Sequence, residues 1–288
     1  MNILFIGSAG PLSVIPFRSL CEADYRPHAV AVDAGDYQFS QQGDLAVVTE
    51  DRDSIEALAH LNGTPIIKLS RHSADAAQQV QAFSPDIIFV SCFARKLSNE
   101  VLSAPSIGCF NLHPSVLPAY RGPSPMFWQF RDGVSEMGIT LHRVSARLDE
   151  GNIIGQTSVA IPNGVTMQQA CVLLAEAGGE LLVQALSRRD QTNWIGVAQP
   201  ADRASYQGFP SASDYIVSTG WPAKRLFNFI CATRGPGIVF PCTVDKRIFK
   251  LVEAIGFQET GEARLLVEGD ELVLPCKSGF VRARFLKS

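Results

Sequence analysis

Short, uninterrupted apolar runs separated by helical segments are the sequence feature that most constrains the fold. Mostly apolar predicted strands occupy residues 2–6, 28–32 and 65–68 of the 288-residue chain, and residues 87–90 form a continuous apolar run. An apolar run that does not alternate with polar residues is typical of a strand buried on both faces of a parallel sheet. Strands that alternate with helices imply right-handed βαβ crossovers. The pattern therefore predicts an α/β fold with a doubly wound, mostly parallel sheet.

A polar, proline-containing segment divides the chain into two parts. We place a first domain at residues 1–190, a linker at residues 191–210 and a second domain at residues 211–288, because a chain of this length suits two domains. The second domain contains a predicted amphipathic helix at residues 222–233. Five short apolar runs follow it between residues 238 and 285, which predicts a small OB-like β-barrel.

The composition excludes several classes of protein. Hydrophobic residues make up 46% and charged residues 18% of the chain, as in an ordinary globular protein. No apolar run approaches the roughly 18 residues of a membrane span, and the N-terminal residues resemble a strand rather than a signal peptide. The seven cysteines are scattered, and no pair has metal-ligand spacing. We therefore expect a cytoplasmic protein with reduced cysteines, no metal and no membrane partner.

Polar residues of types suited to catalysis follow two predicted strands near the middle of the chain. Asn111 and His113 end the strand that begins at Gly108, and a proline-rich loop comes next. Two residues apart on a strand, these side chains lie on the same face, and strand ends of open α/β sheets bind ligands. A second strand, residues 138–144, leads into a turn that contains Asp149. If the two segments are neighbours, Asp149 reaches His113.

The three side chains together suit acyl transfer through a tetrahedral intermediate. An imidazole transfers protons at neutral pH, and a nearby carboxylate raises its pKa by favouring the charged form. The amide of Asn111 can donate to an oxygen that gains negative charge. Ser115 lacks the G-x-S-x-G context of an activated nucleophile. Direct attack by a bound amine is therefore favoured over a covalent enzyme intermediate.

Structural roles are the alternative for each of these residues. A histidine that follows a strand is often a capping or packing residue. Asp149 also suits a purely structural role as a turn residue. Arg95 is compatible with a surface position. The other four histidines are assigned structural roles by default, although His142 lies close enough in the sequence pattern to line the site. These four are His28, His60, His72 and His142.

A longer pattern resembles the signature of folate-dependent formyltransferases. It starts with Asn111-Leu112-His113-Pro114-Ser115 and runs through residues 111–122, 138–142 and 148–153, and residues 93–98 resemble the folate-binding loop of that family. The resemblance covers roughly residues 1–188 and implies the family's Rossmann-like fold. Residues 222–230 are more loosely similar to the C-terminal domain of methionyl-tRNA formyltransferases and of some sugar formyltransferases.

The resemblance implies a role for each matched residue. Asn111 would stabilise the oxyanion, His113 would act as general acid and base, and Asp149 would set the protonation state of His113 and order water. Three loops would hold the pterin of the co-substrate 10-formyltetrahydrofolate. Their residues are Phe93, Ala94, Arg95, Lys96, Leu97, Ser115, Val116, Leu117, Pro118, Ser145, Ala146, Arg147 and Leu148.

The charge distribution bears on the acceptor of the formyl group. The net charge is −3, and residues 33–51 contain five acidic residues but no Lys or Arg, whereas the resemblance to methionyl-tRNA formyltransferases leads one to expect a basic loop there. We therefore expect a small amine acceptor, such as an amino-sugar nucleotide or an amino-acid derivative. A tRNA acceptor, a hydrolase that releases formate from the same donor, a binding module without chemistry and a homo-oligomer stay open as alternatives.

Overall fold

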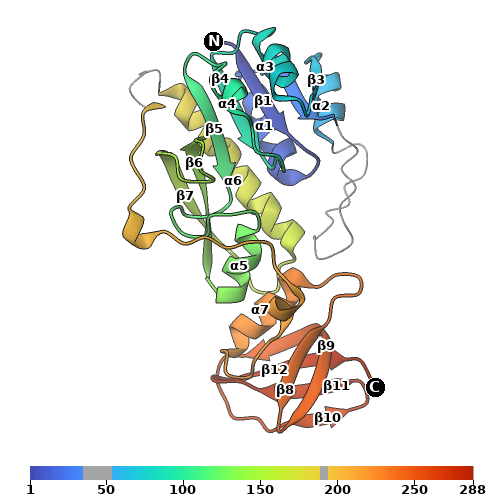
Figure 1. Cartoon of the computed structure of the whole chain (residues 1–288). Coiled ribbons are helices and arrows are strands. Elements are labelled where there is room, and N and C mark those ends of the chain that lie inside the picture. Colours follow the sequence, from blue (N-terminus) through green and yellow to red (C-terminus); the bar gives the residue numbers. More distant parts are fainter. Residues whose placement is uncertain (35–53, 189–193, 288) are drawn as a thin grey trace.

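The computed structural model describes residues 1–34, 54–188 and 194–287. The acidic segment discussed above therefore lies, except for its first two residues, outside the described residues. The described chain forms two sheets with helices (Figure 1).

The larger sheet has seven strands in the order β3-β2-β1-β4-β5-β6-β7. Neighbouring strands from β3 to β5 pair in parallel, whereas β6 and β7 are antiparallel additions at one edge. This arrangement confirms the predicted doubly wound, mostly parallel sheet. The strands are β1 (Ile3–Gly7), β2 (Ala29–Asp33), β3 (Ile66–Leu69), β4 (Ile87–Ser91), β5 (Gly108–His113), β6 (Glu136–Arg143) and β7 (Ile153–Ala160).

Helices cover both faces of this sheet because its central strands are apolar on both sides. Phe89 of β4 belongs to the hydrophobic core beneath α1 (Pro11–Glu22), α2 (Ile55–Leu61) and α6 (Met167–Ser187). Its neighbours Ile88 and Val90 face the opposite core, which α3 (Ser73–Gln81) and α4 (Asn99–Leu102) cover. This alternation follows from the two-residue period of a strand. Asn111 and His113 share the second face, in line with Cys109.

Helix α6 is long and apolar enough to cross a membrane by length and composition alone. The mean hydropathy of its most apolar stretch is 1.4. A core helix passes the same test, and half of its most apolar stretch is buried inside the protein. It packs closely on α1, since a Cβ placed on Gly179 would lie 2.3 Å from the Ser19 hydroxyl. The apolar character of α6 is thus explained by its contacts with α1 and with strands β6 and β7 of the sheet.

The smaller sheet has five antiparallel strands in the order β10-β11-β12-β9-β8, which confirms the predicted small β domain. Helix α7 (Ala223–Thr233) packs on it through the predicted apolar stripe, including Leu226 and Ile230. Strand β9 is longer than expected because its pairing with β12 continues past two register shifts. The strands are β8 (Phe240–Val244), β9 (Arg247–Gln258), β10 (Leu266–Glu268), β11 (Glu271–Pro275) and β12 (Phe280–Phe285).

Helix α5 (Pro125–Asp132) joins the two parts of the molecule. The Phe127 ring lies 5.2 Å from the Tyr215 ring and 5.5 Å from the Phe229 ring of α7, centroid to centroid. The Nε of Arg225 donates to the carbonyl of Arg131 at 2.7 Å. A continuous hydrophobic cluster consequently runs from the large sheet to the small one.

Candidate active site

Pairing between β5 and β6 brings together the polar side chains that the sequence placed on two strands. Asn111 lies opposite His142, and His113 lies opposite Thr140. Residues opposite one another on antiparallel strands share a face of the sheet. The turn that contains Asp149 folds back over this face, and the three predicted residues thus lie together, with His142 as a fourth member.

His113 is buried and has a defined tautomer. Its Nε2 lies 2.8 Å from the carbonyl oxygen of Tyr120. A carbonyl only accepts hydrogen bonds, which means that Nε2 carries the hydrogen. The basic lone pair of the neutral ring is therefore on Nδ1, which lies 3.7 Å from Oδ2 of Asp149. A proton taken up by His113 would arrive on the nitrogen that faces the carboxylate.

Asp149 occupies a tight turn with a backbone φ of 54°, a left-handed conformation that Asp adopts more readily than most residues. Its Oδ2 accepts a hydrogen bond from the Gly122 amide at 3.0 Å. Burial alone would raise the pKa of this carboxyl. The neighbouring His142 and His113 rings and the Gly122 amide outweigh burial, and the pKa of Asp149 lies below its usual value. Asp149 is therefore ionised at neutral pH.

His142 orients the Asn111 amide, a contact that the sequence interpretation did not assign. The Nδ1 of His142 donates to the carbonyl of Arg143 at 2.9 Å, and Nε2 is thus the acceptor in the neutral ring. In this tautomer the Nδ2 of Asn111 donates to Nε2 at 3.2 Å, and Oδ1 of Asp149 lies 3.6 Å from the same nitrogen. The amide has a second hydrogen for a substrate oxygen. The cross-strand register that reveals this contact is not visible in the sequence.

The net effect on His113 differs from the expectation for an imidazole beside a carboxylate. Burial lowers the pKa of His113 below 6.5 and outweighs the raising effects of Asp149 and of the hydrogen bond to Tyr120. Asp149 raises the pKa of His113 in the predicted direction, but burial, which the sequence does not show, sets the direction of the net shift. A lowered pKa keeps His113 neutral, and hence available as a base, at neutral pH.

The loop after β4 lies at the carboxyl end of that strand. The Arg95 side chain reaches away to the end of β3, where it donates to the carbonyls of Leu69 and Ser70 and lies 3.0 Å from Asp33. Phe93 packs against the hydrophobic cluster of the site-bearing face. The Arg95 guanidinium is therefore held by groups of the protein itself, and the folate-binding role of this loop stays a prediction.

The other two loops flank His113 and Asp149. The amide of Leu117 donates to the Thr140 hydroxyl at 3.1 Å, which fixes the loop after β5 to β6. Val116 in this loop is 41% exposed, and Leu148 in the turn before Asp149 is 49% exposed. Exposed apolar side chains beside a polar site suit one face of a flat heterocycle.

Gly151 allows the Asp149 turn to approach β6. A Cβ at this position would lie 1.8 Å from the Arg143 carbonyl oxygen, and we therefore expect Gly151→Ala to lower the free energy of unfolding by about 1–3 kcal/mol. Denaturant unfolding measures the change. Gly208→Ala is the matched control because a Cβ there has open space; equal stability of the two variants would contradict the close approach.

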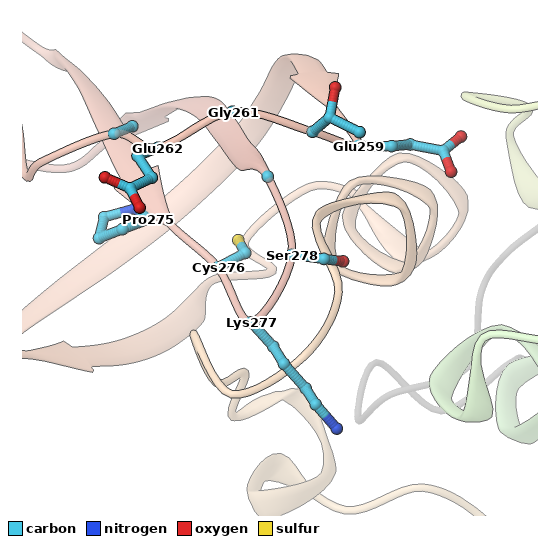
Figure 2. A pocket seen from close by; sticks show the side chains of 10 residues that line it. Glu259, Gly261, Glu262, Pro275, Cys276, Lys277 and Ser278 are labelled. Carbon is cyan, nitrogen blue, oxygen red and sulfur yellow. The ribbon is translucent and has the colours of Figure 1, made fainter.

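A hollow of about 490 Å³ lies away from these residues. It is formed by residues 259–263 and 275–279 of the small β domain. In Figure 2 the side chains of Glu259, Glu262 and Lys277 point in different directions and do not converge on one ligand position.

All seven cysteines are free thiols, and within the described ranges no three His, Cys, Asp or Glu side chains form a potential metal site.

The fold and the site define an α/β enzyme built to transfer an acyl group. A family model described as formyl transferase matches residues 26–186, which is more than half of the chain. The chain belongs to the formyl transferase family, and the predicted resemblance to folate-dependent formyltransferases is confirmed.

The names of individual relatives contain two kinds of formyl acceptor, a tRNA and a sugar. The methionyl-tRNA formyltransferase of Geobacillus thermodenitrificans is 27% identical over 252 residues, 87% of this chain and 76% of the relative. Among solved structures, an N-formyltransferase from Helicobacter canadensis in complex with folinic acid and dTDP-3-aminofucose has a TM-score of 0.72 at 18% identity, covering 99% of this chain and 100% of that chain. WlaRD, a sugar 3N-formyl transferase, has a TM-score of 0.67 at 17% identity, covering 100% and 98%.

Proposed function

We propose that this enzyme transfers the formyl group of 10-formyltetrahydrofolate to a small-molecule amine. The observation that carries the proposal is the buried arrangement in which the basic Nδ1 of His113 faces the ionised Asp149 at 3.7 Å. A proton acceptor, a carboxylate and an amide donor on one face are the groups that attack of an amine on a formyl carbon needs.

Each residue has one task in the reaction. The acceptor nitrogen forms a bond to the formyl carbon, and the carbonyl oxygen gains negative charge. Asn111 donates its second amide hydrogen to this oxygen. His113 takes the proton that the amine loses, on Nδ1, and Asp149 stabilises the resulting imidazolium. His113 then returns the proton to the departing nitrogen of the donor as its bond to carbon breaks.

The arginines of β12 in the small β domain favour a small acceptor over a nucleic acid. They are neutralised by acidic neighbours: Arg284 lies 3.0 Å from Glu253 and 3.4 Å from Glu271, and Arg282 lies 3.3 Å from Glu271. A tRNA-binding surface needs cations that are available to phosphates. Similarity to two solved N-formyltransferases whose complexes contain dTDP-3-aminofucose or dTDP points to the same class of acceptor.

An acceptor panel tests the proposal. Tetrahydrofolate release from 10-formyltetrahydrofolate is measured with amino-sugar nucleotides, hydroxylated ornithine or lysine, and charged initiator tRNA, and without an acceptor. We expect turnover that depends on a small amine. Turnover with tRNA alone would contradict a small-molecule acceptor and favour tRNA, the substrate in the name of the methionyl-tRNA formyltransferase relatives. Formate release without an acceptor would favour a hydrolase. The absence of tetrahydrofolate release with every acceptor tested would contradict the proposed acceptor class.

Asn111→Ala should lower kcat by about 10²–10³-fold, the usual cost of removing one oxyanion donor. Binding of a folate analogue should stay within a few-fold of the wild type, since the donor acts on charge that develops during the reaction. Steady-state kinetics and titration calorimetry measure the two quantities. An increase in KM for the amine with an unchanged kcat would instead assign Asn111 to acceptor recognition.

A further inference from the structure

Residues 194–210, here called the strap, connect the two sheets by a path across the candidate active site. Figure 1 shows this gold segment passing β6 and β7 on its way to α7. Val197 pairs with Ile153 directly after the Asp149 turn, and Tyr206 pairs with Arg121 in the loop after β5. The segment predicted as a linker therefore contacts both loops that carry the site.

Gln199 uses both ends of its side-chain amide in this contact. Its Nε2 donates to the carbonyls of Asp149 at 2.7 Å and Gly151 at 2.8 Å. Its Oε1 accepts from the Nε of Arg121 at 3.1 Å and from Nη2 at 2.7 Å. The remaining guanidinium nitrogen of Arg121 lies 3.4 Å from Glu150. One glutamine thus links the backbone of the Asp149 turn to the loop that follows His113.

A second set of strap contacts holds the hydrogen-bond acceptor of His113. The amide of Tyr120 donates to the Ser205 hydroxyl at 2.8 Å, and the Ser205 amide donates to the Pro118 carbonyl at 3.1 Å. Tyr120 has a left-handed φ of 60°, which a bulky residue keeps only when its surroundings enforce it. The strap therefore restrains both partners of His113, the Tyr120 carbonyl and the Asp149 carboxylate.

We infer that Gln199 is a positioning residue that holds Asp149 against the Nδ1 of His113 through the backbone of the Asp149 turn. The inference rests on the proposed function for its effect on turnover. Gln199 touches carbonyl oxygens and a guanidinium, not the reacting atoms, and it acts only through Asp149 and Arg121. Because Asp149 is itself in a left-handed conformation, its turn depends on such bonds to keep one geometry.

The test compares Gln199→Ala with Asp202→Ala, an exposed substitution on the same strap. The first measurement is the NMR titration of the His113 ring, assigned by its loss in His113→Gln. The titratable groups around this ring are Asp149 and His142. If Gln199 holds Asp149 in place, His113 in Gln199→Ala loses part of the carboxylate's raising effect and titrates at lower pH than in the wild type. The control should titrate as the wild type does.

Kinetics supply the second measurement. We expect kcat of Gln199→Ala to fall by about 10–100-fold, as expected for a small misplacement of catalytic groups, with KM for the donor changed by less than about threefold. Gln199→Glu keeps an oxygen for Arg121 but loses both donors to the turn, and its kcat should fall as in the alanine variant. Its titration is not compared, because the added negative charge itself raises the pKa of His113. A wild-type titration of Gln199→Ala together with wild-type kcat in both folded variants would overturn the inference.

Folding is checked by near-UV circular dichroism and thermal melting. If Gln199→Ala does not fold, Gln199→Glu replaces it in the kinetics and Arg121→Lys replaces it in the titration, because Arg121→Lys keeps the charge and removes the guanidinium fork that orients Gln199. The titration needs no substrate, and it therefore separates the two hypotheses. A shifted His113 titration with no turnover in the wild type would contradict the proposed function alone, whereas normal turnover with an unshifted titration would contradict the role of Gln199 alone.

Discussion

Replacing His113 with alanine should reduce kcat by about 10²–10⁴-fold, the usual contribution of general acid–base catalysis. The imidazole is the proton acceptor for the attacking amine, and a methyl group offers no lone pair in its place. Binding of a folate analogue should change by only a few-fold, because the inferred folate loops do not include His113. Single-turnover kinetics and calorimetry measure the two effects.

His113→Asn is the matched variant for the packing role of the ring. It leaves a polar side chain in the buried site and should also be inactive, because an amide does not shuttle protons at neutral pH. Both variants should show cooperative unfolding close to that of the wild type. Loss of the folded state in both, or retention of turnover in either, would contradict the catalytic assignment of His113.

Asp149→Asn should lower kcat by about 100-fold or more, as expected when a histidine base loses its carboxylate partner. The asparagine still accepts the Gly122 amide hydrogen, which means that the main loss is the negative charge. The negative charge of Asp149 raises the pKa of His113. Its removal lowers this pKa further, and the deprotonated base persists to lower pH.

The pH–rate profile provides the measurement for this prediction. The acid limb of kcat/KM, which we assign to His113, should lie below pH 6.5 in the wild type and move to lower pH in Asp149→Asn. Gly208→Ala, on the strap and without contacts for its added methyl group, serves as a control with an unchanged limb. An unshifted limb in Asp149→Asn would mean that Asp149 does not tune His113, and a shift to higher pH would contradict the sign.

Much of the fold could be predicted because its determinants are local. Continuous apolar runs marked the buried parallel strands, and the apolar stripe of residues 222–233 marked α7. Asn111 and His113 could be placed on one face because the two-residue period of a strand is independent of its neighbours. The proximity of Asp149 to His113 was a conditional expectation, since it depended on which strands lie side by side.

The sequence by itself determined the class of sheet, the small β domain and the residue types with the required chemistry, because periodicity and side-chain identity are properties of short segments. Only the tertiary structure decided the partners of those residues. His142 orients Asn111 through an antiparallel register between β5 and β6. Burial, a property of the whole packed chain, decides the direction of the His113 pKa. The strap reads as a polar linker in sequence, yet Gln199 joins loops 50 and 78 residues away, and long-range contacts of this kind leave no periodic signal along the chain.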